Sequence, residues 1–598
     1  MESKEIVRNV FEACGFFPDI TFAVLKDKAL IRFSLDNKLL MHDLLQEMGR
    51  EIVRQESKEP GKRSRLWIPE EIHQVLTKNK YLVHLKELDL RGCKYLTTIP
   101  NLSNAKNIET IDLEGCERLT ELPSSIQYLD KLENLNLRHC AMLMSLPDKL
   151  DSNYLKEFHL TRCSNVKKCP EISSNIALLD LRYTAITDLP PFQNSTVQNE
   201  LDLTGCSNLC KFPDISGNIK HLCLTDSAIE EVPSSIQFLT GLVRLIIKNN
   251  RKLLKLPDSI CMLKSLKVLD LSGCTNFECF PEILEPMDSL SNLFLRQTSI
   301  KELPSPIEHL GRLTRLILDS CKKIASLSST MHQLSRLNMI DLSCCDSLRV
   351  LPQFPQSLKN LKANHCKSLE TLSSKSECNF QNMHLANCLE LEGKVDAQFA
   401  IQIMAAKVCE NGDEARFLFP GSEIPQWCRY KSIGSSGIIK LPSNWDKLKG
   451  VILCIVFALD QEPPRSLESP NEYWIRCKCY AKANSYEHED LEEIIIWDRQ
   501  CFDGDLHLVK SDHVFVWFNP FGTLFEGSSF VDLLKKYSGS EARFEFCIEG
   551  YSELARHCNW RVKKCGVDLL FDDEAITKET FASEEKEEIE PKPKRSKH

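Results

Sequence analysis

A leucine-rich frame that recurs at a fixed spacing constrains the fold of this chain more than any other feature. The frame L-x-x-L-x-L-x-x-[C/N/S/T] appears thirteen times, with successive starts 21 to 24 residues apart. The starts are Leu85, Ile108, Leu132, Leu155, Ile176, Gln198, Ile219, Leu242, Leu266, Leu290, Leu313, Leu337 and Leu358. This period is the signature of leucine-rich repeats, which are stable only when neighbouring units stack. The sequence therefore predicts an α/β solenoid with the shape of a horseshoe.

Each unit contains a short strand and a position for a small polar residue. In Leu88-Asp89-Leu90 the leucines point inward and Asp89 outward, as the two-residue period of a strand requires. The small residue follows three positions later, where its side chain can bond to backbone groups that turn away from the sheet. It is Cys93, Cys116, Cys140, Cys163, Cys206, Cys274, Cys321, Cys345, Cys366 and Cys388 in ten places, and Thr184, Ser227, Asn250 and Thr298 in others. So regular a column predicts buried reduced thiols rather than a disulfide framework.

Composition and charge limit the classes of partner and the cellular compartment that we expect for this chain. A formal charge of −9 provides no basic field for nucleic acid, so we expect no nucleic-acid partner. Met1–Glu5 lacks an apolar signal core, and the apolar run Gly450–Leu459 is too short to cross a bilayer. We expect a cytoplasmic protein without membrane contact. The basic run Pro591–Lys597 is either a nuclear-import signal or a solvated chain end.

The segment before the repeats, residues 1–80, has a helical pattern. His42–Arg54 carries apolar side chains on one helical face, at Leu44, Leu45, Met48 and Ile52. Two short strands, Ala29–Phe33 and Lys38–Met41, precede this helix around a turn at Asp36-Asn37. The resulting order of helix, hairpin and helix is typical of a winged helix.

The segment after the repeats changes from leucine frames to separated strands. The repeats are expected over residues 81–390, with an imperfect last strand in Phe380–Cys388, and a helix over Val395–Lys407 in the linker 391–412. A β-sandwich of jelly-roll type is expected over residues 413–571, and a disordered charged tail over 572–598. The predicted strands are 416–419, 437–441, 451–457, 474–480, 514–518, 543–548 and 567–571.

Three blocks of the sequence resemble one protein family. They are Met41–Arg54 with Pro60–Trp67, the repeat wording of Leu88–Cys93 and Leu122–Ile126, and Phe419–Trp427 with Lys564–Val567. In this order they resemble the winged helix, the repeats and the post-repeat C-JID domain of plant intracellular disease-resistance receptors of the TIR-NBS-LRR class. The resemblance covers residues 5 to 571 and implies a segment of an innate-immune receptor that recognises a pathogen effector protein and takes part in defence signalling.

The resemblance also assigns a nucleotide contact. Met41-His42-Asp43 matches the family motif whose histidine approaches the β-phosphate of ADP, with Asp43 in support. The alternative is that Asp43 only caps the following helix and His42 is a surface residue. No G-x-x-x-x-G-K-[S/T] phosphate loop occurs in the sequence, so no cofactor is expected for this chain alone, and ADP or ATP only in a complete receptor.

Enzymatic activity is not expected of this chain. The TIR domain, whose family activity is NAD⁺ cleavage, has no counterpart in the sequence, although a full-length gene product could carry it. Cys477-Lys478-Cys479 lies on an expected strand without a second cysteine pair, so no metal site is predicted. We expect partners to be the effector and other domains of a complete receptor, with oligomers only after activation. The alternative is a non-catalytic leucine-rich-repeat adaptor, such as a substrate-recognition subunit of a ubiquitin ligase.

The predicted partner-binding site lies on the inner face of the solenoid. Most residues between the two inward positions are polar, but three of them are apolar and should be exposed. Exposed apolar side chains cost solubility unless something covers them, and arginine is enriched in interface hot spots. The candidate residues are Arg244, Ile246, Phe294, Arg296, Arg315 and Ile317. The alternative is that the C-terminal sandwich or a loop covers this cluster within the same chain.

Overall fold

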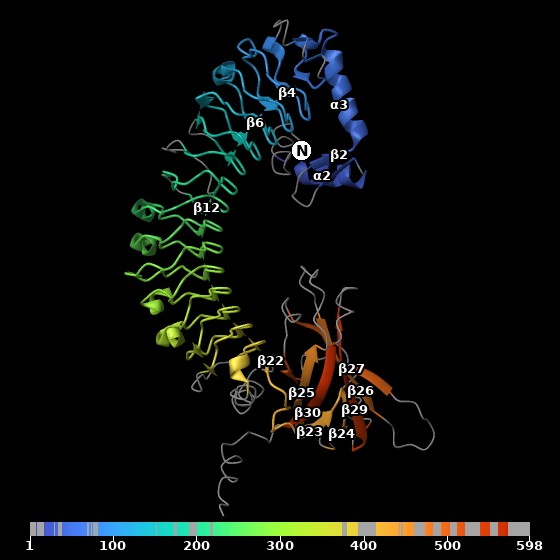
Figure 1. The fold of residues 1–598 in the computed structure, drawn as a ribbon. Helices are drawn as coiled ribbons and strands as arrows, with labels where there is room; N and C mark the ends of the chain where they lie inside the picture. Colours follow the sequence, from blue (N-terminus) through green and yellow to red (C-terminus); the bar gives the residue numbers. More distant parts are fainter. Residues whose placement is uncertain are drawn as a thin grey trace, which may run out of the picture. The chain divides into compact units, whose positions relative to one another are not determined.

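The chain consists of two compact parts, residues 1–228 and residues 229–598. Figure 1 shows the helices and strands of both parts, coloured along the sequence. The computed structural model describes residues 8, 17–28, 30–33, 39–68, 71–72, 74–75, 82–150, 152–172, 176–189, 200–215, 219–372, 380–392, 414–441, 443, 447–459, 473–481, 492–502, 511–520, 537, 539–550 and 560–571. The helix predicted over Val395–Lys407 and the tail predicted from residue 572 lie outside the described residues.

The first part begins with a helix, a hairpin and a second helix, which confirms the predicted order. Helix α2 (Pro18–Asp27) packs on strand β1 (Ile31–Phe33), where Phe22 meets Phe33 edge to face at 5.3 Å. Strand β2 (Leu39–Met41) pairs antiparallel with β1, and helix α3 (Asp43–Glu56) follows. Leu44, Met48 and Ile52 stand four residues apart on one side of α3 and are exposed. A short 3₁₀-helix, η1 (Pro60–Lys62), precedes the sheet.

A parallel sheet makes up the rest of the first part. Its order is β3, β4, β5, β6, β8, β10, β11 and β12. The bounds are β3 Arg65–Leu66, β4 Glu87–Asp89, β5 Thr110–Asp112, β6 Asn134–Asn136, β8 Glu157–His159, β10 Leu178–Asp180, β11 Glu200–Asp202 and β12 His221–Cys223. A second pair of parallel strands is β7 (Lys149–Leu150) with β9 (Glu171–Ile172), and the 3₁₀-helices are η2 (Leu82–His84) and η3 (Ser124–Tyr128). The sheet thus begins with β3, one strand before the first predicted repeat. This strand was not predicted, because Arg65-Leu66 lacks the leucine frame.

The second part continues with the same kind of strand. The parallel order is β13, β14, β15, β16, β17, β19 and β21, and β18 pairs with β20. The bounds are β13 Arg244–Ile246, β14 Val268–Asp270, β15 Asn292–Phe294, β16 Arg315–Ile317, β17 Met339–Asp341, β18 Val350–Leu351, β19 Asn360–Lys362, β20 Thr371–Leu372 and β21 Asn382–His384. The 3₁₀-helices are η4 Ser234–Phe238, η5 Asp258–Met262, η6 Ile307–Leu310, η7 Ser329–Gln333 and η8 Leu389–Leu391. Each of the thirteen predicted starts precedes one strand of these two sheets, and β21 confirms the imperfect last unit.

The column of small polar residues forms a hydrogen-bonded ladder. The Cys116 thiol donates to the carbonyl oxygen of Leu90 in the preceding repeat at 3.1 Å, and the Cys274 thiol donates to that of Ile247 at 2.9 Å. Burial raises the pKa of Cys116 to about 12 and has the same effect on Cys274. These cysteines are free thiols, as predicted, and their high pKa makes them poor nucleophiles at neutral pH.

The residue before each ladder position has a left-handed backbone. It is a glycine in four units, Gly92, Gly115, Gly205 and Gly273, with φ between 70° and 77°. In other units a residue with a side chain takes the same conformation, for example His139 at 61° and Tyr183 at 56°. Glycine avoids the steric cost of this conformation, which is about 1–2 kcal/mol for other residues.

The C-terminal region is a sandwich of two antiparallel sheets. One has the order β22, β28, β25, β30 and β23, and the other β24, β29, β26 and β27. The bounds are β22 Ala415–Pro420, β23 Tyr430–Ile433, β24 Ser436–Lys440, β25 Leu448–Leu459, β26 Tyr473–Ala481, β27 Glu492–Phe502, β28 His513–Pro520, β29 Glu541–Gly550 and β30 Trp560–Phe571. All seven predicted strands are present, and β23 and β27 were not predicted. Leu453, Phe515, Trp517 and Phe544 are among the side chains that fill the core.

Strand β22 joins the repeats to the sandwich. It pairs in parallel with β21, the last repeat strand, and antiparallel with β28. Beside this seam, the backbone N–H of Asn387 donates to Nε2 of His513 at 2.8 Å, while Nδ1 of His513 lies 2.9 Å from the carbonyl oxygen of Ser511. The ring therefore carries its proton on Nδ1. Burial lowers the pKa of His513 to about 4, because a charged ring would lose its hydration and Nε2 could no longer accept.

The left-handed position before the ladder yields a prediction for two matched glycines. Gly205→Ala should destabilise the chain more than Gly92→Ala, by about 1 kcal/mol or more. Both have positive φ, but a Cβ on Gly205 would lie 2.2 Å from Cδ1 of Tyr183, whereas one on Gly92 meets nothing within 4 Å. Urea unfolding followed by far-ultraviolet circular dichroism measures the difference. Equal losses would show that Tyr183 moves aside without cost.

The buried imidazole yields a prediction for acid stability. The folded pKa of His513 lies below the ordinary 6.5, so its contribution is complete above pH 6.5 and is lost as the pH falls toward 4. The loss by pH 4 is on the order of 3 kcal/mol. His513→Gln can still accept from Asn387 but does not titrate, so its stability should fall less between pH 6.5 and 4.5. Parallel losses in both proteins, measured by tryptophan fluorescence in urea, would contradict this assignment.

Candidate partner-binding site

The open face of the parallel sheet carries the predicted site. This face is formed by the residues on either side of the inward leucine of each strand, and in the second part they align in two rows. The first row is Arg244, Val268, Asn292, Arg315 and Met339, and the second row is Ile246, Asp270, Phe294, Ile317 and Asp341. The inward residues between the rows, such as Leu293 and Leu316, are fully buried and hold the strands in this register.

The structure brings two of the predicted apolar residues together. Phe294 and Ile317 are direct partners on adjacent strands, and both are partly exposed. Ile246, also partly exposed, is separated from Phe294 by Asp270 on β14. The apolar patch therefore centres on the pair Phe294–Ile317.

The three predicted arginines do not form a single cluster. Arg244 and Arg315 are exposed and stand in the first row. Arg296 lies two residues beyond Phe294, and its Nε is 2.7 Å from Oδ2 of the buried Asp319. That carboxylate already engages Arg296, whereas the guanidinium of Arg315 contacts the sulfur of Met339 at 3.8 Å.

Sequence reasoning missed two apolar members of the same face. Val268 and Met339 are partly exposed and stand in the first row, next to the predicted residues. The sequence contains a signal for them, because each lies two residues before a second-row position in the repeat frame. Lys248, also missed, stands after β13 and binds Asp270 at 3.0 Å.

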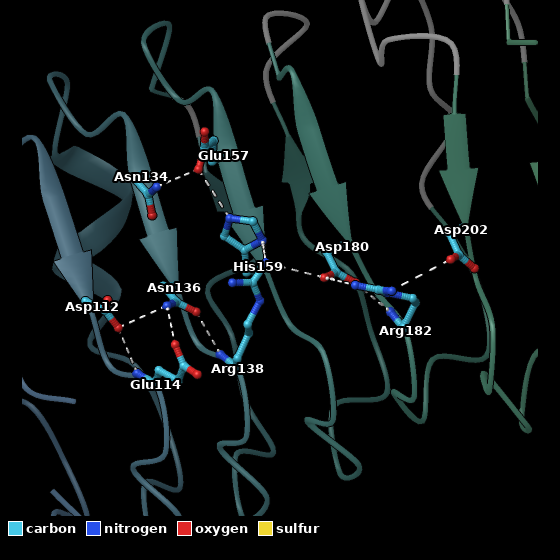
Figure 2. Close-up of polar contacts among 10 residues, drawn as sticks. All are labelled: Asp112, Glu114, Asn134, Asn136, Arg138, Glu157, His159, Asp180, Arg182 and Asp202. Carbon is cyan, nitrogen blue, oxygen red and sulfur yellow. Dashed lines mark hydrogen bonds and ion pairs between the residues drawn. The ribbon is translucent and has the colours of Figure 1, made fainter. Parts of the chain in front are cut away.

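The first part presents a different, polar face, which is shown in Figure 2. Asn136 on β6 donates to Asp112 on β5 at 3.0 Å, and Arg138 donates to Nδ1 of His159 on β8 at 2.9 Å. Because Nδ1 accepts, the neutral His159 ring carries its proton on Nε2, which lies 3.4 Å from Glu157. That contact lowers the pKa of Glu157.

The network continues across the next strands through an arginine. Arg182 donates to Asp180 at 2.8 Å and lies 4.0 Å from Asp202 (Figure 2). Arg138 approaches the same Asp180 at 3.7 Å from the other side. Burial alone would raise the pKa of Asp180, but the hydrogen bonds from Arg182 outweigh it and hold the pKa at about 2. This face is thus a chain of mutually satisfied charges, without an apolar pair like the one in the second part.

The cysteine pair considered in the sequence lies in the sandwich core, and the described residues do not gather metal ligands. No group of three or more His, Cys, Asp or Glu side chains among them could hold a metal ion. Cys477 and Cys479 both point into the sandwich core, where burial raises their pKa. No helix among the described residues is long and apolar enough to cross a membrane.

The Met41-His42-Asp43 motif lies at the start of α3. His42 takes the N-cap position, where its Nδ1 accepts from the backbone N–H of Leu44 at 3.2 Å. Asp43 is therefore the first helical residue, and the carbonyl oxygen of Met41 accepts from Gln46 at 2.8 Å. All three motif residues are exposed. With Nδ1 occupied, the neutral ring presents an Nε2–H donor, which suits a phosphate oxygen.

Comparisons with known proteins place these parts in a family. Residues 2–57 match the winged-helix domain of Roq1-like disease-resistance proteins, residues 262–372 match the leucine-rich repeats of RPS4B-like disease-resistance proteins, and residues 419–576 match the C-JID domain. The three matches define a repeat protein with a winged helix before the repeats and a C-JID domain after them. The chain thus has the winged helix, the repeats and the C-JID domain of a TIR-NBS-LRR-like disease-resistance protein region. None of the three matched domains is catalytic.

Individual relatives agree with this placement. The chain is 29% identical to the disease-resistance protein RPS4B of Arabidopsis thaliana over 366 residues, covering 57% of the chain and 30% of the relative. It is 31% identical to RPS6 of the same plant over 364 residues, covering 60% and 30%. The chain thus spans about a third of the length of these relatives. A leucine-rich-repeat protein of Leptospira interrogans superposes over 54% of the chain and 94% of its own length, with 19% identity and a TM-score of 0.28.

The charge network of the first part yields a prediction. Arg182→Ala should lower the free energy of unfolding by about 2 kcal/mol at pH 7, because it leaves the buried Asp180 short of its main donor. The folded pKa of Asp180 lies below its ordinary value, so this contribution is present above pH 3.8 and is lost as the pH falls through 2. The defect in the variant should therefore shrink at pH 3.

A matched substitution in the same part serves as control. Lys94→Ala removes an exposed ion pair with Glu117 and should cost less than about 0.5 kcal/mol. Urea unfolding at pH 7 and pH 3 gives all the required values. If Arg182→Ala and Lys94→Ala were equally mild at pH 7, the Asp180 network would contribute no net stability.

Proposed function

We propose that this chain is the recognition portion of a plant innate-immune receptor and binds a pathogen effector protein on the open face of its second part. The observation that carries this proposal is the partly exposed pair Phe294–Ile317, with the partly exposed Ile246, Val268 and Met339 on the same face. Apolar groups that are exposed to water on a sheet face have an unfavourable hydration free energy, which is relieved when a partner covers them. An aromatic residue with nearby arginines is the composition of an interface hot spot.

Membership of the disease-resistance family supports the kind of partner. A receptor of this family acts in defence, so a protein of pathogen origin is the partner that the patch would meet. The chain would work in the cytoplasm, and Pro591–Lys597 would allow import into the nucleus. The C-JID sandwich would take part in recognition, because β22 fixes it to the last repeat strand.

The winged helix supports a second element of the proposal. In a complete receptor His42 would donate from Nε2 to a phosphate of ADP, while the helix start holds the ring through Nδ1. Asp43 and Met41 would assist by fixing the turn before α3. Bound nucleotide would stabilise the inactive state of such a receptor. The residues of this chain would contribute only the histidine to the nucleotide site. Effector binding would weaken that hold, which requires two conformations with different contact energies.

The adaptor alternative receives less support. A recognition subunit of a ubiquitin ligase would need a linker-binding helical motif before the repeats. Residues 2–57 instead match a winged helix of disease-resistance proteins. The alternative predicts the same exposed patch, so the identity of the bound protein distinguishes the two functions.

An interaction screen with the complete chain tests the proposed function. The 598-residue protein is the bait, and a library of secreted proteins from plant pathogens is the prey. The double variant Phe294→Asp/Ile317→Asp should weaken the recovered interaction about a hundredfold, because buried charges replace apolar contacts at the centre of the interface. Binding is measured by biolayer interferometry on the purified pair.

The matched control is Phe238→Asp/Leu254→Asp. These side chains are 74% and 59% exposed and lie outside the two rows of the open face, so binding should be unchanged. Far-ultraviolet circular dichroism verifies that both double variants are folded. Unchanged binding by Phe294→Asp/Ile317→Asp would remove this surface from the proposal.

A further inference from the structure

The cations on the open face of the second part differ in whether a carboxylate neutralises them. Lys248 lies 3.0 Å from Asp270, and Arg296 lies 2.7 Å from Asp319. Arg244 and Arg315 are exposed, and neither has an ion-pair partner among the residues that the structure describes. The face thus contains two guanidinium groups whose charge is available to another molecule.

The spacing of these two arginines follows from the register. Arg244 aligns with Val268, Val268 with Asn292, and Asn292 with Arg315, so the two arginines are three strands apart in one row. Neighbouring strands lie about 4.8 Å apart, which places the two Cα atoms about 14 Å from each other. An extended peptide covers this distance in four residues, at about 3.4 Å per residue.

Two residues stand between the arginines in the first row, the apolar Val268 and the polar Asn292. The apolar pair Phe294 and Ile317 stands in the second row, on the same strands as Asn292 and Arg315. A carboxylate stands on either side of this pair in the second row, Asp270 before Phe294 and Asp341 after Ile317. Because Lys248 and Arg296 are each paired with a carboxylate, the positive charge that is not neutralised lies along the first row, where a bound carboxylate would be attracted.

From this arrangement we infer that the partner presents an extended acidic segment with an apolar residue at its centre. The pattern is [Asp/Glu]-x-Φ-x-[Asp/Glu], where Φ is a large apolar side chain. Residues i, i+2 and i+4 of an extended chain point to the same side, so both carboxylates would reach Arg244 and Arg315 while Φ packs on Val268 and Phe294. This inference rests on the proposed function, since it names the chemistry of the segment that binds the same surface.

A peptide selection tests the inference without knowledge of the natural partner. The probe is a phage-displayed library of random twelve-residue peptides, selected on the immobilised complete chain. Peptides with the acidic and apolar pattern should be enriched. Arg244→Glu/Arg315→Glu should lower their recovery about tenfold or more, because each attraction becomes a repulsion. The control Arg312→Glu/Arg336→Glu makes the same change in net charge at exposed residues before the two strands β16 and β17, and should retain the peptides.

The outcomes separate this inference from the proposed function. Apolar peptides that show no acidic preference, and that depend on Phe294 and Ile317 but not on Arg244 and Arg315, would overturn the acidic segment and leave the surface in place. Peptides whose recovery is insensitive to both double variants would overturn the surface as well. Equal losses in the control and test variants would mean that net charge alone attracts the peptides, and would also overturn the inference. Circular dichroism confirms folding of each variant.

Discussion

The structure depends on the hydrogen bonds by which the ladder cysteines tie their repeats to the preceding repeats where the strands end. A three-residue strand is too short to be stable by itself, and its leucines are covered only by neighbouring units. The chain must then turn sharply out of the sheet, which leaves carbonyl groups to be satisfied in a dry interior. The ladder thiols of Cys116, Cys140 and Cys163 meet this need by donating to carbonyl oxygens of preceding repeats. Where threonine or serine takes the ladder position, at Thr184, Ser227 and Thr298, the hydroxyl donates instead to a carbonyl oxygen of its own repeat.

With the interior fixed in this way, the outward positions are free to vary, and the two parts use them differently. Along β5 to β11 charged outward residues pair with one another, so that Arg138 and Arg182 are shared among carboxylates and His159. Along β13 to β17 the same positions hold apolar side chains and two arginines whose charge is not neutralised within the described chain. The same backbone therefore supports a self-satisfied surface in one part and, we propose, a partner-binding surface in the other.

Sequence alone was sufficient for the repeats, because one frame recurs and each copy confirms the others. It was insufficient where a local feature had no such copies. Arg65-Leu66 joins the sheet without a leucine frame, and Tyr430–Ile433 is short and half polar, so neither β3 nor β23 was predicted. Of the partner-binding candidates, Arg296 pairs with Asp319 although Arg315, on the next strand, has no such carboxylate. Arg296 stands two residues after the second-row residue Phe294, and Asp319 stands at the same position of the next repeat. The repeat frame aligns these two residues, so the pair can be predicted when this third outward position is compared along with the two rows.

The double pairing of β22 has a consequence for how the repeat stack ends. The last strand of any such stack offers unpaired N–H and C=O groups to other chains, which is a route to aggregation. Here the first strand of the sandwich occupies that edge, and β28 covers β22 in turn. The C-terminal domain thus protects the end of the solenoid as a cap repeat would elsewhere. A repeat gained or lost inside the stack during evolution would leave this junction unchanged and would be tolerated. A unit inserted after β21, in contrast, would have to re-form the junction.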